Sequence, residues 1–445
     1  MLSLVPKLHD LVGSPASRTV AQLRELGVEP TDRQARIAVV VGPSPSPARQ
    51  LMAATLIDML LRLDPLVGEV IINAPGMNEN ALASELATRL PLLVGSANAR
   101  AHYSIGVGPG AGGDLMADGA GWLAAIGGNA EAADDGNPIG PLAGAALTAD
   151  EAFKWAFATI YPERTALLEL TPWNGVFSFF SYDLNHASPP ISDVHIATTA
   201  IGVGGVGAGF VQAIAALGDL VSGALDLVDD DILTTDNLNR VSYATLQGAL
   251  AGAAKVIEAQ ALLRRCCPNL ITTGHEKNFG AYKREIPRRE DRIYDVVVTG
   301  LDNDQARWEV QRDLPRILID GATGKDMAAR VERVELGRYG CLGCSRRPAP
   351  VAADAPINCD TPPDVYAPSL SFLSSFPGIL AAGEVIKEAM GTGGLRGQFD
   401  HIFRYGPNPD MTGTPAIRTD CPVRCSRPTK IAQYRRKYPY EEFPS

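Results

Sequence analysis

The amino-acid sequence predicts an α/β protein made of two unequal copies of one unit, with parallel-rich sheets and flanking helices. Residues 36–42 form a continuous apolar run that ends in glycine, residues 195–202 match this run, and each precedes a stretch of helical period. Such runs are typical of parallel strands that are buried on both faces. The tripeptide Asp-Gly-Ala occurs in both copies, at residues 118–120 and 320–322. A duplicated chain of alternating strands and helices favours two α/β domains packed together as a pseudo-dimer.

The first copy, residues 1–162, is expected to keep the fold without a nucleotide site. Its predicted elements are a helix over 18–26, strands over 36–42 and 69–72, a helix over 48–63, strand-like runs at 101–110 and 121–127, and a closing helix over 147–161. Residues 163–193 then form an aromatic connector, which we expect to pack between the two halves.

The second copy spans residues 194–425 and is followed by a basic, aromatic tail, 426–445. Its predicted elements are strands over 195–201, 223–228, 295–299 and 316–319, helices over 206–217, 247–265 and 371–390, and a β-like stretch near 399–405. The tail either holds a partner protein or is a solvated end.

Composition narrows the class of protein. A formal net charge of −10 argues against a general nucleic-acid binder. The chain has neither a run of about 18 apolar residues nor a basic lead before an apolar segment, so we expect no membrane span and no signal peptide. We therefore expect a cytoplasmic protein.

A glycine-rich loop follows the first strand of the second copy. Gly202, Gly204, Gly205 and Gly207 leave the backbone open to a phosphate at the start of a helix. Asp229 ends the next strand, where a carboxylate binds ribose hydroxyls in dinucleotide folds. The first copy has Gly-Pro-Ser-Pro at 42–45 and Asn73 at the matching places. Only the second copy is therefore expected to bind a nucleotide, and an NAD-dependent oxidoreductase fits these features as well.

The residues from Asp229 onward separate these alternatives. Residues 229–240 read DDDILTTDNLNR, which resembles the D-x-D-x-V-x-x-S-N-L-N-R signature of the ThiF, MoeB and ubiquitin-activating enzyme superfamily. Lys255 matches the lysine of that superfamily's G-x-P-K segment, and residues 302–307, DNDQAR, match D-N-x-x-x-R. The resemblance covers roughly residues 195–430 and implies two Rossmann-like ThiF-type domains, the first of them inactive. Asp236 replaces the serine, Val241 the usual glutamine, and the proline before the lysine is missing.

The resemblance implies ATP-dependent adenylation of a carboxylate. Negative charge builds on the α-phosphate during this reaction, so cations must stabilise it. Arg240 and Lys255 would hold phosphate, and Asp302 would bind Mg²⁺. The remaining nucleotide contacts would come from Asp229, Asp231, Asn237, Asn303 and the four loop glycines. In many members an arginine of the partner unit reaches ATP, and here Arg18 and Arg24 are the candidates.

Two close cysteine pairs predict a structural zinc site. Cys341 and Cys344 form a C-x-x-C pair, whereas Cys421 and Cys425 are separated by three residues. Two such pairs supply four thiolates to one tetrahedral Zn²⁺. The resembling family carries a four-cysteine zinc clip, although its second pair is usually C-x-x-C.

Cys359 stands where the autophagy-type activating enzymes place their reactive cysteine, before the helix predicted at 371–390. The resemblance implies that Cys359 takes the acyl group of a ubiquitin-like protein as a thioester and passes it to a conjugating enzyme. The compact layout suits a bacterial system. Three alternatives stay open: adenylation of a sulfur carrier or peptide without a thioester, an NAD-dependent oxidoreductase, and a scaffold without activity.

Overall fold

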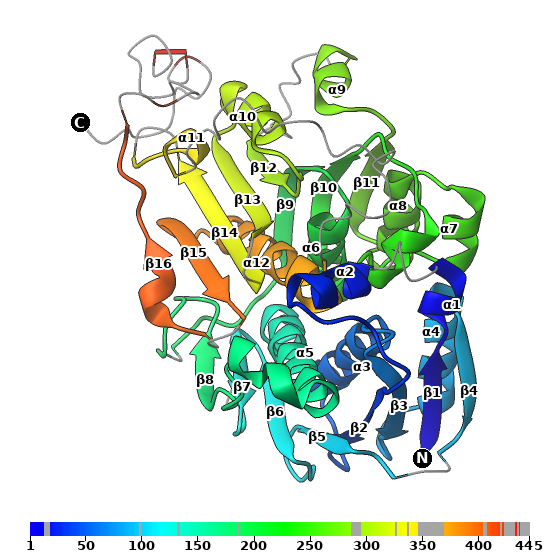
Figure 1. Cartoon of the computed structure of the whole chain (residues 1–445). Helices are drawn as coiled ribbons and strands as arrows, with labels where there is room; N and C mark the ends of the chain where they lie inside the picture. The colour runs from blue at the N-terminus through cyan, green and yellow to red at the C-terminus, as the bar shows by residue number, and fades with distance from the viewer. Residues whose placement is uncertain are drawn as a thin grey trace.

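The fold is taken from a computed structural model of the chain, which describes residues 1–12, 18–97, 100–130, 134–185, 187–285, 295–324, 327–335, 338–345, 369–403, 407–418, 421, 432–433 and 436. Each half contains one eight-stranded sheet with helices packed on it (Figure 1). This arrangement confirms the predicted α/β class with two related halves.

The first sheet has the strand order β4-β1-β3-β2-β5-β6-β7-β8. Strands β3, β2, β5 and β6 run parallel, and antiparallel strands lie on both sides of them. The strands are β1 (Leu2–Pro6), β2 (Ala35–Val41), β3 (Val67–Asn73), β4 (Leu92–Ser96), β5 (Tyr103–Val107), β6 (Leu115–Ala120), β7 (Leu123–Ile126) and β8 (Gly175–Ser178). The helices are α1 (Leu8–Val12), α2 (Arg18–Glu25), α3 (Pro47–Leu61), α4 (Glu79–Arg89), α5 (Ile139–Ile160) and the 3-10 turn η2 (Pro162–Leu167).

The second sheet has the order β11-β10-β9-β12-β13-β14-β15-β16, parallel from β11 to β13 and antiparallel beyond. Its strands are β9 (Val194–Ile201), β10 (Val221–Val228), β11 (Leu270–His275), β12 (Val296–Thr299), β13 (Ile317–Gly324), β14 (Ala328–Glu335), β15 (Gly397–Ile402) and β16 (Thr412–Gly413). The helical segments are α6 (Gly205–Ala216), η3 (Gly218–Leu220), η4 (Thr235–Asn239), α7 (Leu246–Ala251), α8 (Lys255–Cys266), α9 (Phe279–Glu285), α10 (Asp304–Arg312), α11 (Leu342–Ser345), α12 (Ser371–Ala389) and η7 (Pro409–Met411).

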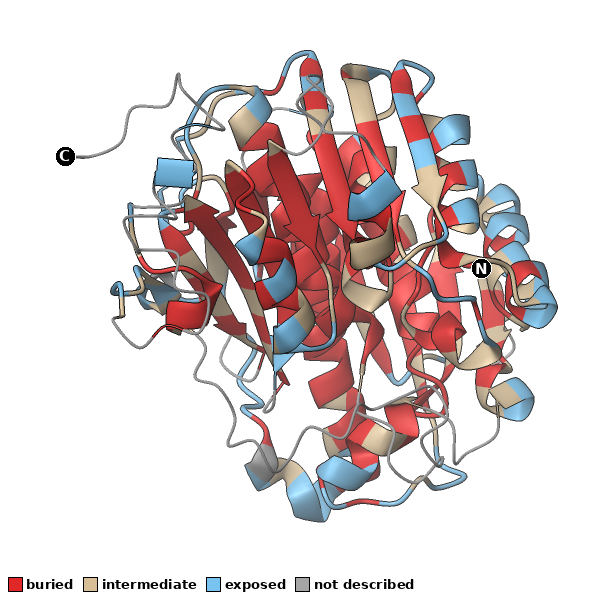
Figure 2. Cartoon of the chain, turned by 90° about the horizontal axis from the view of Figure 1, so that it is seen from above, coloured by how far each residue is buried: buried red, intermediate tan, exposed pale blue. Residues whose placement is uncertain are grey.

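The two halves share one hydrophobic core. Helices α5 and α12 pack against each other between the sheets (Figure 1), and the rings of Phe153 and Phe372 lie 5.9 Å apart. Figure 2 shows that the buried residues fill the central strands and the helices beside them. Part of the predicted connector joins this core, because β8 completes the first sheet and Phe177 lies 5.8 Å from Phe399 of the second half. The halves are therefore held together as one packed body.

The predicted single helix over 247–265 is wrong. The helix α7 ends at Gly252, which adopts a left-handed conformation with φ +66°, and α8 begins afresh at Lys255. Between the two helices, Ala254 forms a β-bridge with Ile232. A glycine in this conformation ends a helix without the strain that a Cβ would cause. The interruption places Lys255 in the first turn of a new helix.

Candidate active site

The glycine loop joins β9 to α6, as the sequence predicts. Gly202 has φ +81°, and a Cβ on Gly207 would lie 2.3 Å from the carbonyl oxygen of Gly202, so both positions require glycine. Gly204 is the residue before the first turn of α6, and a Cβ there would meet open space. A Cβ on Gly205 would lie 3.5 Å from Cδ of Arg240. The loop thus presents the amide end of a helix next to an arginine, which suits a phosphate.

Asp229 follows β10 and holds the loop in shape. Its Oδ2 accepts a hydrogen bond of 2.7 Å from the amide of Val203, and its Oδ1 accepts one of 2.9 Å from the amide of Asp231. Burial raises the pKa of Asp229 above its usual range, although the nearby Lys255 charge opposes this effect. Val203 is also fixed by the hydroxyl of Tyr243, which donates to its carbonyl oxygen at 2.5 Å. No sequence motif indicated this tyrosine.

Lys255 is buried beside the acidic end of β10. Its Nζ lies 2.6 Å from Oδ2 of Asp231, and its backbone amide donates to the carbonyl oxygen of Asp231 at 3.1 Å. Asp231 itself is half-exposed, whereas the Lys255 side chain is only 11% exposed. The lysine is therefore held by the motif at both ends. Its ammonium group faces the half-exposed Asp231 carboxylate at this edge of the sheet.

The turn η4 carries the predicted Asn237 and Arg240. The Asn237 side-chain oxygen accepts a hydrogen bond of 3.2 Å from the amide of Thr234. Asn237 therefore caps the turn. Nη1 of Arg240 donates to the carbonyl oxygen of Asp236 at 2.8 Å and to Oδ1 of Asn239 at 2.9 Å. These contacts hold the arginine against the glycine loop.

Arg18 comes from the first half and reaches the same turn. Its Nη2 lies 3.6 Å from Oδ2 of Asp236, the same carboxylate oxygen that lies 3.6 Å from Nη2 of Arg240. Arg24 instead forms an exposed ion pair with Glu29. Of the two candidate arginines, the structure brings only Arg18 to the motif. Arg18 makes this contact through Asp236, the residue that replaces the serine of the signature.

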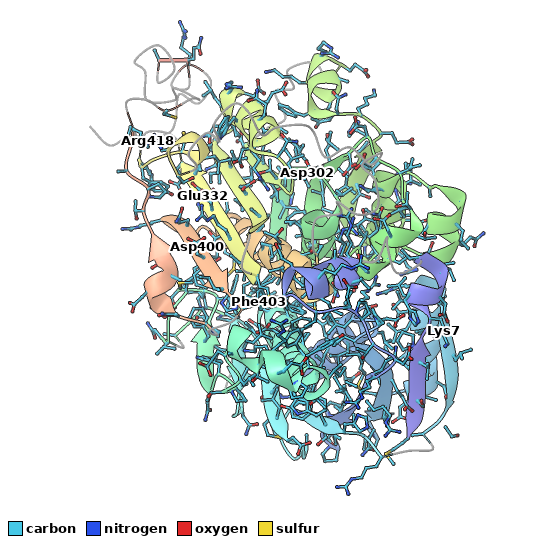
Figure 3. All side chains as sticks on the ribbon, in the orientation of Figure 1. Lys7, Asp302, Glu332, Asp400, Phe403 and Arg418 are labelled. Atoms are coloured by element: carbon cyan, nitrogen blue, oxygen red, sulfur yellow. The ribbon has the colours of Figure 1, made fainter. Side chains whose placement is uncertain are left out.

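Asp302 and Asn303 follow β12 at the same edge of the sheet. Strand β12 pairs with β9 in parallel, so its end lies next to the glycine loop, and Figure 3 labels Asp302 there. Asp302 is exposed and accepts a hydrogen bond from the Asn303 side chain at 3.1 Å. The Asn303 side-chain oxygen caps α10 by accepting from the amide of Ala306 at 2.8 Å. An exposed carboxylate beside a phosphate loop fits Mg²⁺, which keeps several waters when bound.

The loop before Asp302 is held by Arg307. This arginine donates from Nε to Oδ1 of the buried Asp320 at 3.1 Å, and from Nη2 to the carbonyl oxygen of Leu301. Thr299 also donates to Asp320, at 2.6 Å. The arginine of the D-N-x-x-x-R motif and the aspartate of the repeated Asp-Gly-Ala tripeptide therefore fix the strand end that carries Asp302.

Three of the four predicted zinc ligands lie together. Sγ of Cys341 is 3.9 Å from Sγ of Cys344 and 3.5 Å from Sγ of Cys421, and all three are buried. Tetrahedral Zn–S bonds of about 2.3 Å separate sulfur atoms by about 3.8 Å. The amide of Arg418, labelled in Figure 3, donates to Sγ of Cys344 at 3.4 Å. The donor set fits Zn²⁺, while Cys425 lies outside the described residues, as does Cys359.

In the first half, a side chain occupies the helix start that corresponds to the glycine loop. The Ala48 amide, in the first turn of α3, donates to the Asp134 carboxylate at 3.1 Å. Arg49 forms two hydrogen bonds of 2.9 Å with Asp118, the counterpart of Asp320. A carboxylate thus occupies the helix end that would otherwise face a phosphate. The prediction that this copy lacks a nucleotide site is consistent with this arrangement.

The second half thus combines a glycine loop at a helix start, an acidic strand end and the cations Arg240 and Lys255. Residues 192–398 match the ThiF family, so the second half of the chain is similar to ThiF-family domains. This match supports an ATP-dependent adenylating enzyme. The comparison with curated proteins gives no match. In the described part of the chain, no helix has the length and apolar character needed to cross a membrane.

Several solved structures are similar. E. coli MccB, solved with ATP, is 15% identical with a TM-score of 0.39, and the match covers 69% of this chain and 97% of MccB. E. coli tRNA N6-threonylcarbamoyladenosine dehydratase, TcdA, is 18% identical with a TM-score of 0.31 over 45% of this chain and 87% of TcdA. PaaA is 15% identical with a TM-score of 0.33 over 47% of this chain and 61% of PaaA.

Proposed function

We propose that this protein uses ATP to adenylate the C-terminal carboxylate of a small ubiquitin-like protein. A carboxylate oxygen forms a bond to the α-phosphorus, the bond between the α-phosphorus and the bridging oxygen breaks, and pyrophosphate leaves. The observation that carries this proposal is the meeting of two cations at one phosphate loop. Arg240 lies against the loop, and Lys255 lies at the acidic strand end beside it.

Each site residue has a role in this proposal. The loop amides and Arg240 bind phosphate oxygens, and Lys255 supplies a point charge to the pyrophosphate. Asp229 accepts hydrogen bonds from the ribose hydroxyls in addition to those from the amides of Val203 and Asp231. Asp302 would hold Mg²⁺, which neutralises charge on the phosphates when bound. Asn303 and Asn237 act mainly through the backbone turns that they cap.

We further propose that one ATP binds per chain. In the first half, Asp134 accepts a hydrogen bond from the amide end of α3, and Pro43 and Pro45 stand in place of loop glycines. An anion at that end would lie against the Asp134 carboxylate, which costs free energy. Calorimetry with α,β-methylene-ATP should give a stoichiometry near one. A value near two would contradict an inactive first half.

The proposed second step uses Cys359. Its thiolate attacks the acyl carbon, a C–S bond forms, the C–O bond to AMP breaks, and AMP leaves with its electron pair. The thioester would then pass to the cysteine of a conjugating enzyme, for which the basic tail, 426–445, is a candidate docking segment. The alternative is an adenylyltransferase that acts on a sulfur carrier or a peptide and stops before this step.

The first experiment tests adenylation and compares two forms of one substrate. Pyrophosphate exchange into ATP is measured with a ubiquitin-like protein that ends in glycine, once with a free C-terminal carboxylate and once as the C-terminal amide. We expect exchange only with the carboxylate form. Equal exchange with both forms, or none with the carboxylate, would contradict the proposed reaction.

The second experiment tests the thioester. The wild type and Cys359→Ala are incubated with ATP and the carboxylate form, and adducts are separated with and without a thiol reductant. We expect a reductant-sensitive adduct in the wild type alone, with pyrophosphate exchange retained in the variant. Exchange without any adduct in the wild type would favour the alternative reaction. Cys266→Ala, a cysteine outside the two predicted sites, is the matched control.

A further inference from the structure

Arg62 belongs to the first half but donates hydrogen bonds to the turn of the second half that carries Arg240. It directly follows α3 and is 1% exposed. Its Nη1 donates to the carbonyl oxygen of Leu238 and, at 3.4 Å, to the carbonyl oxygen of Val241. These two carbonyls lie on either side of Arg240. The contact joins residues that are 176 positions apart in the chain.

The guanidinium of Arg62 is itself held in one orientation. Asp58, one helical turn earlier, accepts from Nε at 2.9 Å and from Nη2 at 3.0 Å. Both side chains are buried. A two-point arginine–carboxylate pair is rigid, because the planar fork matches the two carboxylate oxygens. The remaining nitrogen, Nη1, is therefore aimed at the turn.

Further contacts hold Arg62 itself and the turn that carries Arg240. Thr19, on α2, donates to the carbonyl oxygen of Arg62 at 3.4 Å, and Arg18 lies next to Asp236 of the turn. On the other side of the turn, the Asn239 side chain donates to the carbonyl oxygen of Ser369 at 3.0 Å. The turn is thus held from both halves. Of the contacts made by Arg62, Arg18 and Asn239, the contact from Arg62 is the one that fixes carbonyl groups on both sides of Arg240.

We propose that Arg62 is a positioning residue through which the inactive half fixes the phosphate-binding Arg240. This inference rests on the proposed adenylation and deepens it, because it gives the degenerate copy a role in nucleotide binding. Without Arg62, the buried carbonyl groups of Leu238 and Val241 lose a charged donor. The turn then samples conformations in which Arg240 no longer lies against the glycine loop.

The experiment compares Arg62→Met with Lys154→Met in the full-length protein. Lys154 is a matched control, because it is also a buried cation of the first half that donates to a carbonyl of the second, that of Phe403, at 3.5 Å. It is likewise paired with an acid on its own helix, Glu151, at 2.7 Å. Phe403, labelled in Figure 3, follows β15 and is not part of the motif turn.

Two measurements are made on each variant. Hydrogen exchange of peptides that cover residues 235–244 reports on the turn, and pyrophosphate exchange gives KM for ATP and kcat. We expect Arg62→Met to speed amide exchange in this segment at least tenfold and to raise KM for ATP at least tenfold. Lys154→Met should change neither, even where it lowers Tm equally. Arg62→Lys should recover part of the KM, since it restores one donor.

The outcomes separate this inference from the proposed function. Unchanged exchange at residues 235–244 in a folded Arg62→Met protein overturns the inference. Equal KM increases in Arg62→Met and Lys154→Met also overturn it, because both then reflect general loosening of the halves. If the wild type neither binds ATP nor catalyses pyrophosphate exchange, the adenylation proposal fails. Amide hydrogen exchange still tests whether Arg62 holds the turn. Should Arg62→Met not fold, Asp58→Asn keeps the arginine but frees its orientation, and the same two shifts are expected.

Discussion

Nζ of Lys255 lies 2.6 Å from Oδ2 of Asp231, so a buried cation and a half-exposed carboxylate face each other at the edge of the nucleotide site. The Lys255 amide also donates to the backbone of Asp231. Because Asp231 is the more exposed partner, solvent and ligand reach the pair from its side. In the proposed reaction, this lysine charge would stabilise the pyrophosphate of ATP.

Replacing Lys255 by methionine should lower kcat/KM for pyrophosphate exchange about 100-fold, because a charge that stabilises the reacting phosphates is removed from a site partly shielded from water. The methionine keeps most of the buried stem, so Tm should change little. Lys283→Met is the control, since Lys283 pairs with Asp313 on the surface. A Lys255→Met protein with wild-type exchange would remove the lysine from the site.

Arg18→Ala should raise KM for ATP about tenfold, equivalent to about 1.4 kcal/mol of binding free energy. The reason is that the Arg18 guanidinium, which comes from the first half, lies beside the same Asp236 carboxylate as Arg240. Arg24→Ala, on the same helix, should leave KM unchanged, because Arg24 pairs with the exposed Glu29. The prediction is wrong if the two alanine variants shift KM equally.

The purified protein should contain one Zn²⁺ per chain. Cys341→Ser should abolish the bound zinc, because this sulfur contacts both Cys344 and Cys421. Loss of the metal should lower the free energy of unfolding by about 3 kcal/mol and Tm by about 3 °C. Elemental analysis and thermal unfolding measure both effects, with Cys266→Ser as the control. Zinc retained by Cys341→Ser would show that these thiols are not its ligands.

The fold could be predicted where the sequence pattern is local. The apolar run at residues 36–42 and its match at 195–201 indicated β2 and β9. The tripeptide Asp-Gly-Ala, which occurs in both β6 and β13, made the duplication visible. Strand β11, with exposed Ile271, and strand β14, which contains four charged residues, lack such runs. The break at Gly252 was missed because it depends on a long-range bridge between Ala254 and Ile232.

The candidate site divides in the same way. The glycines, Asp229 and Lys255 belong to short motifs, so their chemistry and spacing could be recognised in the sequence alone. The role of Arg62 could not be predicted, because its partners Leu238 and Val241 offer only backbone carbonyls, which leave no side-chain pattern. The contact of the Asp134 carboxylate with the N-terminal end of α3 could not be predicted either, since Asp134 lies in a loop 86 residues away from Ala48.

The stability of the protein should fall below pH 6.5 because of His401. Among the described residues, neither ring nitrogen has a hydrogen-bond partner, and the ring packs against Phe376 and Phe403. Burial, helped by the charge of Lys154, lowers the pKa of His401 to about 3. In the unfolded chain the pKa of this histidine is about 6.5. As pH falls below that value, His401 takes up a proton in the unfolded state but not in the native state, and the free energy of unfolding decreases.

The loss of unfolding free energy from this histidine should begin near pH 6.5 and reach about 2 kcal/mol at pH 5, since each pH unit between the two pKa values costs about 1.4 kcal/mol. His401→Phe keeps a ring among the aromatic neighbours and removes the titrating group. Its stability relative to the wild type should therefore rise by that amount between pH 7 and pH 5. Urea unfolding at both pH values measures the difference, with the exposed His195→Gln as control. Parallel pH profiles for wild type and His401→Phe would mean that His401 takes up its proton equally in both states, contrary to its burial.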